Sequence, residues 1–230
     1  MKIIADSEHI RFFRERRYIQ FDEVISQIRL DEVNRAIDAL LSSRTGAKPE
    51  LLPSFPPAEI YPYACDLWKE SEIIKKFDCQ SRCADLILSL FDAQKFILGS
   101  DQLLVPEHAK TMGYVPYYSQ VFPEPLALEE QGSIQGVHSA LIVCLSGESK
   151  GIKSVFPTHP GSVTVLSPEY VLDLGELENN LTQRFLLITY AKPDAVYLYR
   201  EGDPNTHYRK SLGYTFGDKL LKKGHPPIRL

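Results

Sequence analysis

Apolar residues recur at helical spacing through much of the first half of the chain. Over residues 30–41 they stand three or four positions apart, which predicts an amphipathic helix whose start Asp31 can cap or charge-match. Residues 66–91 repeat the pattern and predict one long or two shorter helices packed on a sheet. A charged helix over residues 7–16 and a strand over residues 18–21 are expected before them.

The second half of the chain predicts strands instead, because short runs rich in branched and aromatic residues follow one another. Residues 99–101 form a turn or a bulge between the first two runs, and Lys192-Pro193-Asp194 suits a tight turn between the last two. Helices first and strands afterwards indicate an α+β fold, with the sheet folded on itself as a sandwich or jelly roll. The expected strands cover residues 95–98, 102–105, 139–145, 162–166, 184–191 and 195–199.

Composition is that of an ordinary globular protein, and 230 residues suit a single domain over residues 1–230. The net charge of -4 argues against a nucleic-acid partner. Residues 200–230 are locally basic, with seven Lys or Arg against three acids, and this run is expected to be a solvated tail. No run is long and apolar enough to cross a membrane, so no membrane partner is expected.

The four cysteines and the lack of a signal-peptide pattern predict a reduced, cytoplasmic protein. Cys79 and Cys83 are four residues apart and would share one face of a helix. A metal site would need further ligands near them, and the sequence offers no second pair.

Several blocks, taken in their order, resemble the phytanoyl-CoA dioxygenase-like branch of the Fe(II)/2-oxoglutarate-dependent oxygenases. The resemblance implies a double-stranded β-helix, a jelly-roll or cupin-like barrel, with the N-terminal helices packed outside. The blocks are residues 12–21 with the helix that follows, Ser100-Asp-Gln-Leu-Leu104, the strand over residues 139–145, and residues 160–190 with their Asn-rich turn and Arg184.

The resemblance also implies Fe(II) and 2-oxoglutarate as cofactors, but the ligands that would hold the iron are missing. Tyr and Ser stand in residues 115–121, where His-x-Asp is expected. The second His is expected in residues 172–175, and that stretch offers only the carboxylate of Asp173. A lone carboxylate holds such a metal poorly, so no metal site, no cofactor and no catalytic residue is expected.

Arg184 stands where the family's arginine grips the distal carboxylate of 2-oxoglutarate, a role that suits a planar guanidinium. It could equally pair with a structural carboxylate such as Glu178 or lie along the rim of the barrel. The candidate ligand-binding residues are therefore Arg184, Tyr118 and Asp173.

The leading hypothesis is a non-catalytic protein on an oxygenase fold, a pseudoenzyme that binds an unknown small molecule or protein partner. One alternative is an active metalloenzyme with an atypical ligand set. Another is a metal-responsive regulator that binds DNA through the basic C-terminal stretch. The atypical ligand set would be drawn from His108, His138, Asp173 and His207.

Overall fold

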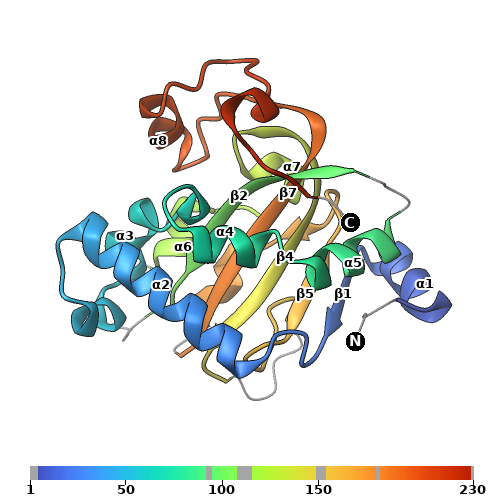
Figure 1. Cartoon of the computed structure of the whole chain (residues 1–230), viewed down its shortest axis with the longest axis horizontal. Helices are drawn as coiled ribbons and strands as arrows, with labels where there is room; N and C mark the ends of the chain where they lie inside the picture. The colour runs from blue at the N-terminus through green and yellow to red at the C-terminus, as the bar shows by residue number, and fades with distance from the viewer. Residues whose placement is uncertain (1–4, 92–94, 108–115, 149–153, 180–181, 229–230) are drawn as a thin grey trace.

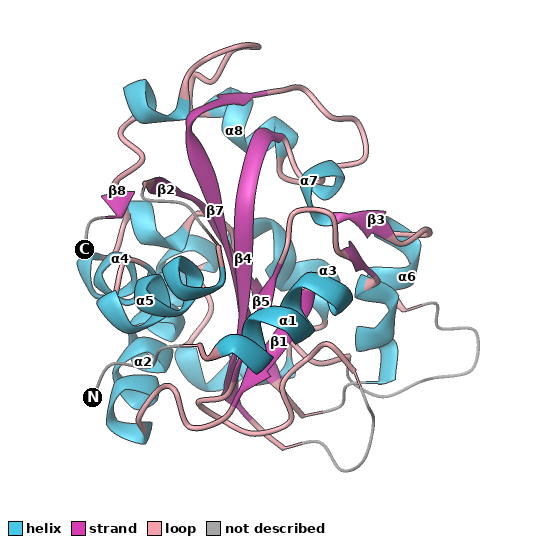
Figure 2. Ribbon diagram, turned by 90° about the vertical axis from the view of Figure 1, so that its right-hand side faces the viewer, coloured by secondary structure: helices cyan, strands magenta, loops and turns pink. Residues whose placement is uncertain are grey.

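The structure is a computed structural model that describes residues 5–91, 95–107, 116–148, 154–179 and 182–228. Across these residues an antiparallel sheet of six strands runs through the molecule in the order β1-β5-β4-β7-β2-β8. Helices cross in front of it in Figure 1, and Figure 2 shows α2, α4 and α5 on one side and α6, α7 and β3 on the other. The strands of this sheet are β1 (Tyr18–Phe21), β2 (Phe96–Leu104), β4 (Ile134–Ser146), β5 (Val163–Leu166), β7 (Arg184–Tyr197) and β8 (Pro227–Ile228).

Helices from the first ninety residues cover one face of the sheet, which we call the helix face. The predicted helix over residues 7–16 and strand over residues 18–21 are confirmed with the same bounds, and residues 66–91 form two shorter helices. The helix at residues 30–41 begins earlier, at Gln27, so Asp31 does not cap it and instead accepts a hydrogen bond from Gln27. The helices are α1 (Ser7–Arg16), α2 (Gln27–Thr45), α3 (Pro57–Ile60), α4 (Glu72–Asp78) and α5 (Ser81–Leu90), with 3-10 turns at Pro49–Ser54, Tyr61–Tyr63 and Leu67–Lys69.

Short elements cover the opposite face, which we call the inner face. Alternation along β7 sends Leu186 and Ile188 into the core beneath the helices, whereas Phe185 and Leu187 pack with the inner-face residues. The small second sheet and the main sheet do not close into a barrel within the described part of the chain. The predicted combination of helices with an antiparallel sheet is confirmed, and the predicted jelly-roll barrel is not. The inner-face elements are β3 (Leu126–Ala127), β6 (Val171–Leu172), α6 (Tyr117–Val121), α7 (Leu128–Gln131) and the 3-10 turn at Leu174–Asn179.

The hairpin predicted at Lys192-Pro193-Asp194 is wrong, because β7 runs through these residues without turning back. Pairing with β4 matches Val137 to Ala191 and then Gln135 to Val196, so the three residues bulge out of the ladder and are exposed. A proline is tolerated there because a bulged residue needs no ladder N–H. The earlier alternative of a bulge near residues 99–101 is confirmed, since the β2 register shifts between Leu98 and Ser100.

The solvated tail predicted for residues 200–230 is also wrong. Residues 199–224, which we call the C-terminal cap, contain α8 (Thr206–Ser211) and a 3-10 turn at Leu220–Lys223, and β8 after them pairs with β2. Arg209 and His225 are buried. The segment is folded, and of its basic side chains Arg209 lies inside the protein whereas Lys210, Lys219 and Lys222 are exposed. Among the described helices, none has the length and apolar character that a membrane crossing requires.

Candidate functional site

A pocket opens on the inner face between the sheet and the C-terminal cap. Its cavity volume is about 70 Å³. On the same measure one water molecule needs roughly 10–15 Å³, so the cavity has room for about five. We call it the interior pocket. Its polar side is formed by Ser100, Asp101 and Gln102 of β2, Thr189 of β7, Gln131 of α7, and Asp203, Asn205 and Arg209 of the C-terminal cap; its apolar side includes Phe122, Leu128, Ile134, Val137, Leu174 and Leu187.

An amide pair fixes the polar groups at the pocket wall. Gln102 donates from Nε2 to the carbonyls of Tyr61 (3.3 Å) and Leu103 (3.0 Å), so its Oε1 is the acceptor for Asn205 Nδ2 at 2.8 Å. This donation sets which way the Asn205 amide points. Asn205 Oδ1 then has no hydrogen-bond partner within the described residues. The residue is buried, with 6% of its surface exposed. A buried acceptor of this kind costs free energy unless something donates to it.

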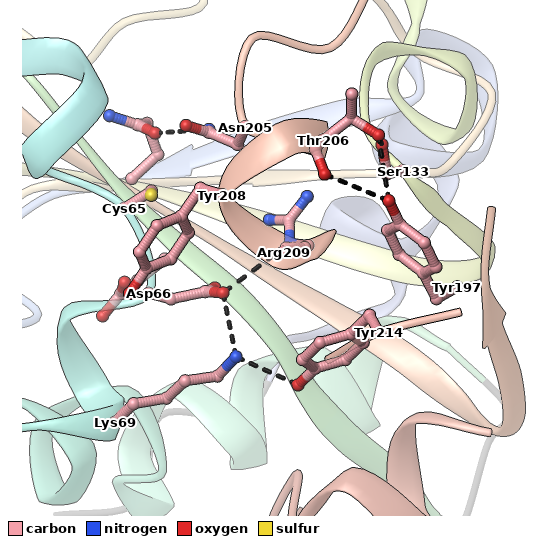
Figure 3. Close-up of polar contacts among 12 residues, drawn as sticks. Cys65, Asp66, Lys69, Ser133, Tyr197, Asn205, Thr206, Tyr208, Arg209 and Tyr214 are labelled. Atoms are coloured by element: carbon pink, nitrogen blue, oxygen red, sulfur yellow. Dashed lines mark hydrogen bonds and ion pairs between the residues drawn. The ribbon is translucent and has the colours of Figure 1, made fainter. Parts of the chain in front are cut away.

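At the pocket wall, Arg209 lies between two carboxylates. Its Nη1 is 3.0 Å from Asp203 Oδ2, and its Nε is 3.6 Å from Asp66 Oδ2. Lys69 completes the network at 3.1 Å from Asp66, as Figure 3 shows. Burial would raise the pKa of Asp66, but the charges of Arg209 and Lys69 outweigh it and hold that pKa below its usual value. The two cations and two carboxylates therefore balance.

The same network fastens the C-terminal cap to the sheet. Ser133 at the start of β4 donates from its backbone N–H to Asp203 (2.8 Å) and from its hydroxyl to Thr206 (2.8 Å). The Tyr197 hydroxyl donates to the Thr206 carbonyl at 3.1 Å (Figure 3). The residues that face the pocket are thus held by contacts between segments far apart in the sequence.

A second chain of hydrogen bonds continues from Lys69 to the far edge of the sheet. Lys69 lies 3.0 Å from the Tyr214 hydroxyl, which lies 2.8 Å from His225 Nε2, and His225 Nδ1 lies 2.8 Å from the Leu98 carbonyl. The carbonyl can only accept, so Nδ1 carries the proton and Nε2 accepts from Tyr214. Burial lowers the pKa of His225 to about 4, which keeps the ring neutral at pH 7.

Two carboxyl groups, Asp78 and Asp101, are neighbours on the helix face behind β2. Asp101 accepts from the backbone N–H groups of Leu67 (2.5 Å) and Trp68 (2.9 Å). Asp78 is 1% exposed, and no donor among the described residues reaches its carboxyl oxygens. Burial and the neighbouring Asp101 charge raise its pKa well above the usual value, and burial raises the pKa of Asp101 to about 6. Asp78 is therefore the carboxyl group of this pair that binds its proton more tightly.

The three candidates from the sequence lie apart from the interior pocket. Tyr118 is fully buried, and its hydroxyl bonds to both the N–H and the carbonyl of Val105 at 3.0 Å. Asp173 accepts from the Gly175 N–H at 2.8 Å, on the turn that packs against α6. None of the three is among the residues that line the pocket.

Arg184 points to the opposite face of the sheet from Tyr118. Its Nη2 is 2.8 Å from Asp38 of α2, in an ion pair whose side chains are 18% and 30% exposed. Glu178, the structural partner considered from the sequence, accepts instead from Ser119 at 3.1 Å. Tyr118 and Arg184 thus belong to different sides of the sheet and do not converge on one cavity.

The histidines considered as atypical metal ligands are also dispersed. The His138 ring is stacked on Phe96 with centroids 5.2 Å apart, and burial lowers its pKa to about 4. His207 is exposed beside Tyr199, and His108 lies outside the described residues. Across the described ranges, no group of three His, Cys, Asp or Glu side chains could hold a metal ion.

Neither the cysteine pair nor Arg209 forms an alternative site among the described residues. Cys79 ends α4 and Cys83 lies in α5, so the two do not share one continuous helix, and all four cysteines are free thiols. Arg209, counted among the basic C-terminal residues, is buried between carboxylates and does not face a phosphate backbone.

Sequence reasoning missed Asn205 because residues 202–207 suit ordinary turn chemistry, and it missed Arg209 because that residue was counted with the basic residues of the predicted tail. The available signal was weak: the two residues are four apart, which places them on one face of a helix, but nothing local shows that this face is buried. Their role depends on where the C-terminal cap docks.

No family profile matches the chain, and no curated protein matches it in sequence. Solved structures do match in three dimensions. The non-heme alpha-ketoglutarate-dependent carbocyclase SnoK from nogalamycin biosynthesis has a TM-score of 0.65 at 14% identity, over 97% of this chain and 96% of SnoK. EctD from S. alaskensis has a TM-score of 0.53 at 11% identity, over 82% of this chain and 77% of EctD. CytC3 has a TM-score of 0.50 at 9% identity, over 89% of this chain and 87% of CytC3.

These matches show a shared fold. EctD was solved with 2-oxoglutarate and 5-hydroxyectoine, and CytC3 with Fe(II) and alpha-ketoglutarate. The chain has the fold of the Fe(II)/2-oxoglutarate-dependent oxygenases, as the order of its sequence blocks implied. At identities this low the likeness does not carry the activity across.

Proposed function

We propose that this chain is a non-catalytic protein on the oxygenase fold, a pseudoenzyme that binds a small polar molecule in the interior pocket. The polar side of this pocket carries the proposal, because hydrogen bonds fix the Gln102 and Asn205 amides there, while apolar side chains form the opposite side. Pockets with mostly apolar walls and a few fixed polar groups are typical ligand sites.

The residues present do not fit the iron and 2-oxoglutarate that the fold implies. The Tyr118 hydroxyl is hydrogen-bonded to the Val105 backbone, and the Asp173 carboxylate accepts a hydrogen bond from the Gly175 N–H. Arg184 is paired with Asp38 on the helix face. Iron sites of this chemistry need two imidazoles and a carboxylate on one centre, and the described residues supply no such group. These positions support a role without oxygenase chemistry.

The test of the non-catalytic role uses the purified full chain with Fe(II) and 2-oxoglutarate under air. We expect no succinate above the protein-free rate and no stoichiometric iron after anaerobic loading and desalting. One iron per chain together with succinate release would refute the proposal and revive the atypical metalloenzyme. An Asp173→Ala variant provides the matched control, because it should change neither result if no metal binds there.

Binding in the interior pocket is tested by comparing two variants in a screen of small polar metabolites. Asn205→Leu fills the polar wall with an apolar group, whereas Gln135→Leu makes a similar change on an exposed position of β4. Metabolites that raise the melting temperature of the parent and of Gln135→Leu but not of Asn205→Leu support the proposal. Metabolites that act equally on all three proteins contradict it.

The free thiols support the predicted reducing, cytoplasmic location.

A further inference from the structure

A second cavity lies on the helix face, at the end of the sheet where β7 begins. We call it the helix-face cavity. One side comes from the strand ends, because Arg184 opens β7, Ser146 ends β4 and is paired with Arg184, and Val105 follows β2. The other side comes from α2, from the 3-10 turn that follows it and from α3. The cavity is therefore built where separate segments of the chain meet.

The helix-face cavity is large and mostly apolar. Its volume is about 290 Å³, compared with about 70 Å³ for the interior pocket. Seven of its eleven lining residues are apolar, among them Leu41, Leu52, Phe55 and Ile60. An engineered cavity of about 150 Å³ with walls of Leu, Ile and Phe binds benzene, so this one has room for a body of roughly two rings. Apolar walls that nothing fills lose their packing contacts, which favours an apolar occupant.

The strand side of the cavity is polar. Arg184 Nη2 is 2.8 Å from Asp38 Oδ1, and Ser146 adds a hydroxyl next to Arg184. Within the described residues Arg184 Nε and Nη1 and Asp38 Oδ2 make no further hydrogen bond, and the two side chains are 18% and 30% exposed. The ion pair thus offers N–H donors and a carboxylate acceptor side by side.

The charges that line the helix-face cavity cancel. Asp38 and Arg184 are the charged residues among its lining, one of each sign, and they form an ion pair. Glu107 follows Pro106 of the lining, but its carboxylate accepts from the Tyr117 N–H of α6 at 2.8 Å. An anionic ligand would meet the charge of Asp38, and a cationic ligand would meet that of Arg184. An uncharged group that both donates and accepts avoids both repulsions.

We propose that the helix-face cavity binds an uncharged molecule with an apolar body of about two rings and an amide head, whose carbonyl accepts from Arg184 and whose N–H donates to Asp38. The site is separate from the interior pocket, so this inference goes beyond the proposed function and does not depend on it. Arg184, a candidate ligand-binding residue from the sequence, here contacts an amide oxygen in place of a carboxylate.

Three indole probes separate ligand charge from ligand shape. Indole-3-acetamide is neutral at pH 7, indole-3-acetate is an anion and tryptamine is a cation, and the three have similar sizes. Each is titrated into the full chain with ¹³C-labelled Ile and Leu methyl groups. The methyl resonances of Leu52 and Ile60 report on the helix-face cavity, and those of Leu174 and Leu187 report on the interior pocket.

We expect indole-3-acetamide to shift the Leu52 and Ile60 resonances with saturation, at a Kd of about 1 mM or below for a ligand of this size. The two ions should bind at least about threefold more weakly, because each meets a like charge in a partly exposed pair.

Three variants tie the shifts to the cavity. Leu52→Phe extends a lining side chain and should weaken indole-3-acetamide several-fold, because the added ring occupies the same space. Leu51→Phe is the matched control on the same turn, and it should leave binding unchanged because Leu51 is 51% exposed. Asp38→Asn removes the negative charge beside Arg184, so indole-3-acetate should gain affinity about threefold or more.

The outcomes distinguish the ligand class, the site and the proposed function. Ions that shift the Leu52 and Ile60 resonances as strongly as the amide, or an unchanged affinity of Asp38→Asn for indole-3-acetate, would overturn the ligand class. Shifts confined to Leu174 and Leu187 would overturn this site and leave binding in the interior pocket standing. No shift of Leu52 or Ile60 with indole-3-acetamide at about 2 mM, above the expected Kd, would overturn the proposal outright.

Discussion

Replacing Arg209 with methionine tests the balanced network directly. Methionine keeps much of the length of the side chain but removes the guanidinium from between Asp66 and Asp203. Lys69 then remains beside Asp66, and Asp203 loses the cation that the described network gives it. Asp66 also has a left-handed backbone conformation, with φ at 48°, which a residue with a side chain adopts only when its surroundings hold it.

Removing one partner of a buried ion pair costs about 3–5 kcal/mol, because the remaining charge is left without compensation. We expect a loss of this size in the free energy of unfolding at pH 7. In the parent protein the pKa of Asp66 is lower in the folded state than in the unfolded state. This difference stabilises the fold at pH values above the unfolded-state pKa, and the stabilisation is lost as pH falls through the folded-state pKa. Without Arg209, burial would raise that pKa instead, so the variant loses stability as pH rises. The deficit should therefore be larger at pH 7 than at pH 5.

Urea denaturation at pH 5, 6 and 7 measures the deficit for each protein. Lys222→Met is the matched control, because Lys222 is exposed on the turn at Leu220–Lys223, and it should change stability by no more than about 0.5 kcal/mol. The double variant Asp66→Asn with Arg209→Met should lose less than the sum of the single variants. A deficit below about 1 kcal/mol, or one that is the same at pH 5 and pH 7, would refute the reasoning.

Three further changes probe other parts of the structure. Asp78→Asn should raise stability increasingly between pH 5 and pH 8, because the raised pKa of Asp78 makes the parent lose stability as pH rises, and urea titrations that show no gain at pH 8 would contradict this. Tyr118→Phe should cost about 1–3 kcal/mol, since the Val105 backbone loses its buried partner, and equal melting curves would count against it. Arg184→Met should cost less than about 1 kcal/mol in urea, because its pair with Asp38 is partly exposed.

Local sequence patterns predicted correctly those helices and strands that are determined by residues close together in the sequence. The helix over residues 7–16 has its own cap at Asp6, and the strand over residues 18–21 follows directly, so both were read with correct bounds. The turn expected at Pro193-Asp194 failed because its chemistry is local, whereas the pairing of β7 with β4 is not. Long-range pairing decided that these residues bulge from a continuous strand.

Strand alternation explains why the position of Arg184 in the sequence did not determine its surroundings. Residues 184, 186 and 188 share one side of β7, and Leu186 and Ile188 are in the core beneath the helices. A shift of one residue in a strand moves every side chain to the other face. The sequence showed an arginine at the expected distance along the chain. The face of the sheet on which its side chain lies depends on the register between β7 and β4, which cannot be predicted from local sequence patterns.

The interior pocket could not be predicted because its polar groups come from separate parts of the chain. Ser100 and Thr189 lie on the sheet, whereas Asn205 and Arg209 reach the pocket only when the C-terminal cap is docked by Ser133 and Asp66. Under the proposed function, ligand binding and docking of the cap are therefore linked equilibria. A ligand of the interior pocket would bind only the docked form, and so it would stabilise the cap by the free energy of its own binding. The same linkage means that loosening the Arg209 network weakens the pocket even where no pocket side chain is changed.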